Sequence, residues 1–313
     1  MNRERGLYGK LPGDPARPRI RLARSLTGVV PEYPAAADYL AQLGGWQMLG
    51  NDREGDCVAV TWSNLRRLTT AVLATEFYPP MDQVQALYAT QNPGGQDNGM
   101  VIQTCLEYLV THGGPDGVKA LGFAAVDFTN PAEVKAAMAI FGAVWVGFEV
   151  LAVNEAEFDA GLPWDYASGS ADVGGHSVLA GGYGVPVRPD AALGGDEKFI
   201  TWAAETSFTD LAWSRLVSEC WAVIWPEHLG SREFMAGMDL ATFAADYTAI
   251  TGRPFPAPVP APPQPSANPD LAFAAALRAT GHDGRPWAFE SHGHEATGRV
   301  AAAARAWLAA KGL

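Results

Sequence analysis

A stretch of sixteen residues, 254–269, contains eight prolines and divides the chain into a long part and a short part. Proline lacks a backbone N–H and fixes its own φ angle, so neither a helix nor a central strand can pass through this stretch. We therefore expect an extended, proline-rich linker at 254–269. The residues after it, 270–313, are too few to enclose a core of their own. They are predicted to form a helical C-terminal tail that docks on another surface.

The long part is predicted to be globular and rich in turns. The chain has 34 glycines and 23 prolines among 313 residues, which argues against an all-helical bundle. It contains no uncharged apolar run of about 18 residues, and its start lacks the basic-then-apolar pattern of a secretory signal. We expect neither a membrane span nor a secretory signal.

Charge is distributed unevenly along the chain. The net charge is −12, yet residues 1–25 carry seven basic side chains against two acidic ones. An acidic body repels nucleic acid, so a nucleic-acid partner is not expected. The charge of the basic N-terminal arm, residues 1–44, would allow a contact with phosphate, but we interpret the arm as a solvated tail or as a tether to an acidic neighbour.

The predicted secondary structure of the body between arm and linker changes near its middle. Residues 45–125 are predicted to be a helical half, with helices at Val58–Ala74, Met81–Ala89 and Met100–Thr111. Residues 126–253 are predicted to be a β-rich half that opens with one helix. That helix runs from the capping signature Asn130-Pro131 to about Phe141. The predicted strands are Ala143–Val150, Ser177–Ala180, Lys198–Trp202 and Trp221–Trp225. A helical half followed by a β half predicts an α+β fold with a cleft between the halves.

Two residues fit thiol chemistry when they are considered together. Cys57 follows a glycine-containing turn and starts a predicted helix, whose dipole favours the nucleophilic thiolate. His176 stands at the start of a short apolar strand in the other half. Each residue alone is more often structural, because free cysteines are commonly buried and inert. Facing each other across a cleft, they suit catalysis in which imidazole takes the proton from sulfur.

Several motifs occur in the order found in a known family. In chain order they are Asn51, Gly55 and Cys57, the glycine-rich turn 97–100 with the helical segment 104–114, and His176 with the strand 177–184. From Asn51 to about Pro226 the chain resembles the papain/cathepsin family of cysteine peptidases. The resemblance implies an α+β, papain-like fold of two subdomains and a protein or peptide substrate.

The resemblance also implies roles for individual residues. Cys57 takes the place of the nucleophile and His176 that of the base. Asn51 takes the place of the side-chain amide that, with the Cys57 backbone N–H, stabilises the oxyanion. The family's orienting asparagine should lie within 199–208, where this chain has neither Asn nor Asp. Glu205 is the best chemical substitute there, because a carboxylate supports an imidazolium; the other polar residues in the stretch are Thr201, Thr206 and Ser207.

A second interpretation belongs to a different class. The segment 46–57, together with the arm and the tail, also resembles uncharacterised papain-like proteins of actinobacterial bacteriophages. The chain would then be a catalytically degenerate, papain-fold virion protein, attached to subunits of the virion or to copies of itself through arm and tail. The missing asparagine favours this interpretation, as do the few residues before Cys57, which predict no long inhibitory propeptide. The implied location is the host cytoplasm or the virion.

No cofactor or metal is expected. The sequence has no phosphate-binding or dinucleotide-binding fingerprint. Its cysteines, Cys57, Cys105 and Cys220, are widely spaced and form no C-x-x-C pair. Three tail histidines, His282, His292 and His294, are interpreted as part of a solvated loop, since nearby acids show no established zinc-ligand spacing.

Overall fold

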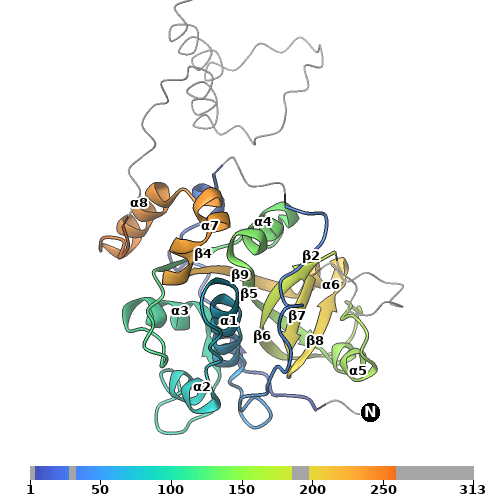
Figure 1. Cartoon of the computed structure of the whole chain (residues 1–313). Helices are drawn as coiled ribbons and strands as arrows, with labels where there is room; N and C mark the ends of the chain where they lie inside the picture. The colour runs from blue at the N-terminus through green and yellow to red at the C-terminus, as the bar shows by residue number, and fades with distance from the viewer. Residues whose placement is uncertain (1–3, 28–32, 185–196, 259–313) are drawn as a thin grey trace, which may run out of the picture.

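The computed structural model describes residues 4–27, 33–184 and 197–258, and these ranges fold into helices packed on both faces of one sheet (Figure 1). The helices are α1 (Cys57–Leu73), α2 (Met81–Tyr88), α3 (Ile102–Thr111), α4 (Pro131–Phe141), α5 (Ala152–Ala160), α6 (Asp210–Leu216), α7 (Arg232–Gly237) and α8 (Leu240–Thr251), with the 3-10 turns η1 (Leu22–Ser25) and η2 (Pro226–Gly230). The strands are β1 (Lys10–Leu11), β2 (Ala37–Asp38), β3 (Met100–Val101), β4 (Gly122–Ala125), β5 (Val144–Leu151), β6 (Asp172–Tyr183), β7 (Glu197–Thr201), β8 (Ala204–Phe208) and β9 (Val217–Ile224).

The main sheet is antiparallel and divides the body into two cores. Its strand order is β4-β9-β5-β6-β7-β8, and β2 adds to β6. Successive residues of a strand point to opposite faces. On β5, Val144, Val146 and Phe148 therefore join one core, whereas Trp145 joins the other. The alternation therefore distributes the apolar side chains of the strand between the two cores.

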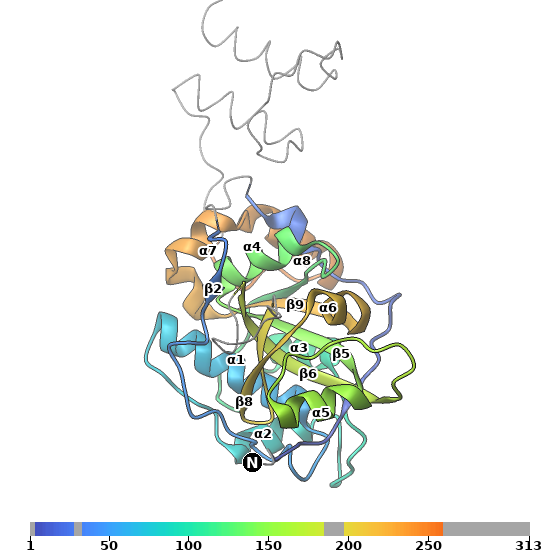
Figure 2. The ribbon, with the colours of Figure 1, turned by 90° about the vertical axis from the view of Figure 1, so that its right-hand side faces the viewer.

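Helix α1 fills the space between α2, α3 and the sheet (Figures 1 and 2). It is buried over most of its length, which includes the guanidinium of Arg66. Arg66 donates to Asp116 at 2.8 Å and to Glu227 at 2.8 Å, and its guanidinium lies 4.5 Å from the ring centroid of Trp225. A buried charge needs such partners, so these contacts pin the helix against the surrounding elements.

The predicted α+β class is confirmed, and several element positions follow the sequence closely. Helix α4 begins at Pro131 after Asn130, whose side chain accepts a hydrogen bond from the Ala132 N–H, as the capping signature predicts. In its described residues, 126–184 and 197–253, the β-rich part contains five helices, α4 to α8, where we expected one. None of the helices in the described ranges is both long and apolar enough to cross a bilayer.

The N-terminal arm packs on the body of its own chain in its described part. Four of its basic side chains pair with acids of the body, and Arg24 among them is still 66% exposed. The pairs are Arg5 with Glu155 and Asp159, Lys10 with Glu149, Arg17 with Glu107, and Arg24 with Asp246. A contact between the arm and a neighbouring protein stays a prediction. The linker from residue 259, the tail 270–313 and its three histidines lie outside the described residues.

Candidate active site

Cys57 is the first residue of α1 and follows a tight turn. Gly50, with φ of 110°, starts the turn, and the N–H of Arg53 donates to its carbonyl at 2.8 Å. Asp56, the residue before the thiol, is fully buried, and Gln85 donates to its carboxylate at 2.9 Å. Burial raises the pKa of Asp56 to about 8. The turn therefore sets the thiol at the helix terminus that the sequence predicts.

The Cys57 thiol is buried, and burial outweighs the helix terminus. Desolvation raises its pKa to about 12, although hydrogen bonds from the backbones of Ser177, Gly9 and Val58 act in the opposite direction. A thiolate needs either water or a nearby cation, and burial removes the first. In this state the sulfur is a neutral thiol at physiological pH.

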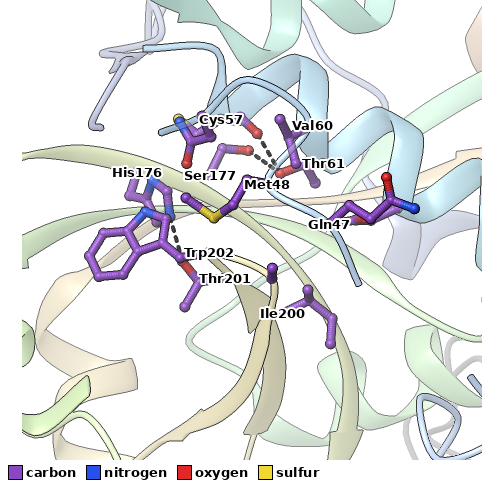
Figure 3. Close-up of a pocket in the computed structure, with 13 residues that line it drawn as sticks. Gln47, Met48, Cys57, Val60, Thr61, His176, Ser177, Ile200, Thr201 and Trp202 are labelled. Atoms are coloured by element: carbon purple, nitrogen blue, oxygen red, sulfur yellow. Dashed lines mark hydrogen bonds between the residues drawn. The ribbon is translucent and has the colours of Figure 1, made fainter. Parts of the chain in front are cut away.

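His176 lies on β6 and lines the same small cavity as Cys57 and Asn51. Figure 3 shows the Cys57 and His176 side chains on the same side of this pocket. The imidazole is enclosed by the rings of Phe148, Tyr8 and Trp202, at centroid distances of 5.8, 5.9 and 5.4 Å. This apolar enclosure lowers its pKa to about 3, so the ring is neutral.

The imidazole is oriented by Thr201 and not by Glu205. Nε2 of His176 lies 2.8 Å from the Thr201 hydroxyl, whereas Nδ1 has no hydrogen-bond partner among the described residues. Glu205 instead pairs with Lys198 and accepts a bond from the Trp46 indole at 3.4 Å. The strand register explains the difference, because Ile200 pairs with Leu179 and so brings Thr201 level with residue 178, next to His176 on that face.

The loop after Thr201 is a tight hairpin turn. Trp202 and Ala203 have φ of 46° and 58°, values typical of a two-residue turn between antiparallel strands. This turn sets the Trp202 ring against His176. Trp202 is a part of the site that the sequence analysis missed.

Asn51 lines the pocket, and its side-chain amide already donates two hydrogen bonds. Its Nδ2 donates to the Leu7 carbonyl at 3.0 Å and to the Glu54 carbonyl at 3.2 Å. The Leu7 N–H in turn donates to the Asn51 carbonyl at 2.7 Å. The amide expected to face an oxyanion therefore faces the chain's own N-terminal segment.

Residues 5–11, which we call the strap, cross the site. The Gly9 N–H donates to Gly175 O at 3.2 Å, and the Gly9 carbonyl accepts from the Met100 N–H at 2.7 Å. Strand β1 of the strap pairs in parallel with β3. A Cβ on Gly9 would lie 1.7 Å from the Gly55 carbonyl oxygen, so only glycine fits. The strap thus lies in the site as an extended peptide.

Side chains near the start of the strap bind α5. Tyr8 donates to Glu155 at 2.6 Å, and Arg5 pairs with Glu155 and Asp159. The space left beside Cys57 and His176 is about 10 Å³, roughly the room that one water needs. The sequence analysis predicted no long inhibitory propeptide, and the strap is a segment of only seven residues beside the site.

A polar network connects the helix of Cys57 to the strand of His176. Ser177 accepts from the Trp145 indole at 2.7 Å and lies 3.0 Å from the Thr61 hydroxyl, which itself donates to the Cys57 carbonyl at 2.8 Å (Figure 3). Cys105 and Cys220 are buried in the cores. In the described ranges no group of three or more His, Cys, Asp or Glu side chains could hold a metal ion.

Comparisons with known proteins bear on the fold. No protein-family model and no curated protein matches the chain. Among solved structures, it is similar to xylellain, a cysteine protease from Xylella fastidiosa, at 16% identity and a TM-score of 0.52, over 72% of this chain and 97% of that one. It is also similar to procathepsin B S9 from Trypanosoma congolense, at 12% identity and a TM-score of 0.52, over 70% and 86%. The described chain therefore has the α+β fold of papain-like cysteine proteases.

Proposed function

We propose that the chain is a cysteine peptidase or related amide hydrolase that its own strap keeps latent. The observation that carries this proposal is that one pocket holds the Cys57 thiol and His176, whose Nε2 pairs with Thr201 while its Nδ1 has no partner among the described residues. We assign the ring proton to Nε2, which makes Nδ1 the basic nitrogen. The fold shared with papain-like proteases supports the same assignment.

The chemistry follows from these positions once the strap is displaced. Nδ1 of His176 takes the thiol proton, and the sulfur of Cys57 bonds to the carbonyl carbon of the substrate amide. The Asn51 amide, released from Leu7, and the Cys57 N–H hold the oxyanion. The imidazolium then protonates the leaving amine as the C–N bond breaks. In the second half-reaction Nδ1 takes a proton from water, the water oxygen bonds to the thioester carbon, the C–S bond breaks, and the acyl group leaves as a carboxylic acid while the proton returns to the Cys57 sulfur.

Displacing the strap also changes the protonation of the pair. With the strap in place, both groups are buried and neutral, so neither favours the charged form of the other. When Tyr8 and Gly9 move out of the site with the strap, water reaches the thiol and the ring. This lowers the desolvation cost of charging Cys57 and His176. The thiolate and the imidazolium then stabilise each other, and the helix dipole adds to this.

The alternative is a degenerate papain-fold protein, such as a subunit of a phage virion. The observations that favour it are the Thr201 hydroxyl in place of an amide or carboxylate and the neutral, covered pair. The ion pairs of the described arm residues with their own chain do not favour the arm as the attachment of such a subunit. Phage origin, host or virion location and self-association stay predictions from the sequence.

Labelling with a peptidyl epoxide, which requires an activated thiolate, distinguishes the latent peptidase from the degenerate papain-fold protein. The test uses Gly9→Ala, whose added Cβ forces the strap away from Gly55, and Gly13→Ala, where the nearest atom is 3.8 Å away, as the matched control. We expect a Cys57 adduct in Gly9→Ala that disappears when His176→Gln is added. If hydrogen exchange shows a released strap and Cys57 still takes no epoxide, the degenerate alternative is correct.

A further inference from the structure

The strap places one charged side chain in the interior of the protein. Lys10 directly follows Gly9, whose backbone lies against the Cys57 thiol. The Lys10 side chain is only 2% exposed. Its Nζ lies 2.9 Å from Glu149 Oε1, 2.9 Å from the Ser218 hydroxyl and 3.8 Å from Glu219 Oε1. The site around Nζ, formed by Glu149, Ser218 and Glu219, is called the lysine pocket below.

The backbone around the lysine pocket leaves room for a side chain that enters from the cleft. A Cβ at Gly175 would lie 2.3 Å from the Lys10 carbonyl oxygen and 3.2 Å from its Cδ. A Cβ at Gly147 would lie 2.7 Å from Glu219 Cγ. Glycine at these two strand positions therefore makes space for the incoming chain and for the carboxylate that receives it.

One carboxylate of the lysine pocket, that of Glu219, is also held by a side chain other than Lys10. Trp221 donates its indole N–H to Glu219 Oε2 at 2.8 Å, and the Glu219 side chain is only 9% exposed. Burial raises the pKa of Glu219, and the charge of Lys10 acts against that rise. Arg19, which lines the adjoining cavity, also lowers the pKa of Glu219. When Lys10 withdraws, a nearly buried carboxylate loses the closer of these two cations, which favours its replacement by another.

Lys10 belongs to the segment that must leave before a substrate can enter. An extended peptide that takes the strap's place meets the same backbone groups, Gly175 O and Met100 N–H, and passes the same pocket. The adjoining cavity, lined by Gln103 and Trp221 among others, has a volume of about 180 Å³ and extends the room available to a long side chain.

We propose that the lysine pocket is the specificity site of the cleft and selects peptide substrates with a lysine within two residues of the scissile bond. This inference rests on the proposed peptidase function. Glu149 and Glu219 provide the charge, and Ser218 accepts a third bond from the ammonium group. The Glu149 side chain is 40% exposed, so the lysine pocket is open to solvent on the side of this carboxylate.

The test uses the Gly9→Ala protein and a mixture of unstructured peptides that differ only in lysine, norleucine, arginine or glutamate at one position. Norleucine keeps the carbon chain of lysine and lacks its charge. We expect lysine peptides to be cleaved at least tenfold faster than norleucine peptides, as kcat/KM, and mass spectrometry places the cut within two residues of the lysine. Adding Glu219→Gln should remove most of this preference.

A matched variant separates loss of charge recognition from loosening of the arm. Asp246→Asn removes the ion-pair partner of Arg24 elsewhere on the arm and leaves the lysine pocket and its adjoining cavity intact, so it should keep the preference for lysine. Equal cleavage of lysine and norleucine peptides by Gly9→Ala overturns the inference and leaves the peptidase intact. Absence of cleavage together with absence of epoxide labelling overturns the proposed function, and the inference with it.

Discussion

The hydroxyl oxygen of Thr201 lies 2.8 Å from Nε2 of His176, at the end of a strand that pairs with the strand of the histidine. A neutral hydroxyl can fix the tautomer and rotamer of the ring, but it supplies no negative charge to an imidazolium. The site therefore depends on orientation by Thr201 and on the thiolate itself for charge balance.

Replacing Thr201 by valine keeps its shape and removes the hydroxyl. In the Gly9→Ala background, we expect the rate of Cys57 labelling by epoxide to fall by roughly tenfold to a hundredfold, a part of what a positioned base contributes. Thr206→Val, which alters a buried threonine on the next strand, is the control. Equal losses in both variants, or no loss at Thr201, contradict an orienting role.

Ser177→Ala tests the network between the helix of Cys57 and the strand of His176. The change leaves the buried Trp145 indole N–H without its acceptor, so the free energy of unfolding should fall by about 1–3 kcal/mol. Ser214→Ala changes an exposed serine on α6 and should stay within about 0.5 kcal/mol. Urea unfolding midpoints measure both, and similar values for the two variants would show that the network adds no stability.

The low pKa of His176 makes a prediction about acid stability. The folded state holds the ring neutral down to about pH 3, whereas the unfolded chain takes up a proton near its ordinary pKa of about 6.5. Between these values the unfolded state binds more protons, so stability falls as pH falls, by up to about 1.4 kcal/mol per pH unit. His176→Gln removes this titration. Below about pH 6.5 the free energy of unfolding of wild type should therefore fall more steeply with falling pH than that of the variant. A difference that stays constant with pH would contradict the buried, neutral ring.

Arg5→Ala should loosen the strap without unfolding the protein. The Arg5 pairs with Glu155 and Asp159 are partly exposed, and such pairs contribute about 0–1 kcal/mol each and weaken with salt. We expect hydrogen exchange at residues 5–11 to be faster in Arg5→Ala than in wild type. High salt should also speed this exchange in wild type, because it weakens the same ion pairs. Arg24→Ala removes a pair at the other end of the arm and should leave exchange at the strap unchanged. Slow exchange in Arg5→Ala would show that Tyr8 and the backbone hold the strap alone.

Local patterns predicted much of the fold because their causes are local. The capping residue Asn130, the helix that starts at Cys57 and the alternating strands each depend on residues close in sequence. The pairing of Cys57 with His176 in one pocket needed the family resemblance as well.

The remaining features depend on contacts between residues far apart in sequence. Nothing near Gly9 signals that it must pack against Gly55, and no charge pattern shows that Lys10 enters the interior. Glu205 was favoured over Thr201 on charge alone, whereas the register of two strands and the competing cation Lys198 decide the outcome. Such choices become visible only when the strands are placed side by side.

The most direct test of strap-controlled activation is the pH dependence of Cys57 alkylation by iodoacetamide in Gly9→Ala and Gly13→Ala. In Gly13→Ala the strap stays in place, and we expect negligible reaction at neutral pH, as for a buried thiol with a pKa near 12. In Gly9→Ala we expect rapid reaction with a midpoint well below the free-thiol value of about 8.5, because water, the helix terminus and His176 then stabilise the thiolate. A released strap with a midpoint at or above 8.5 would contradict the account.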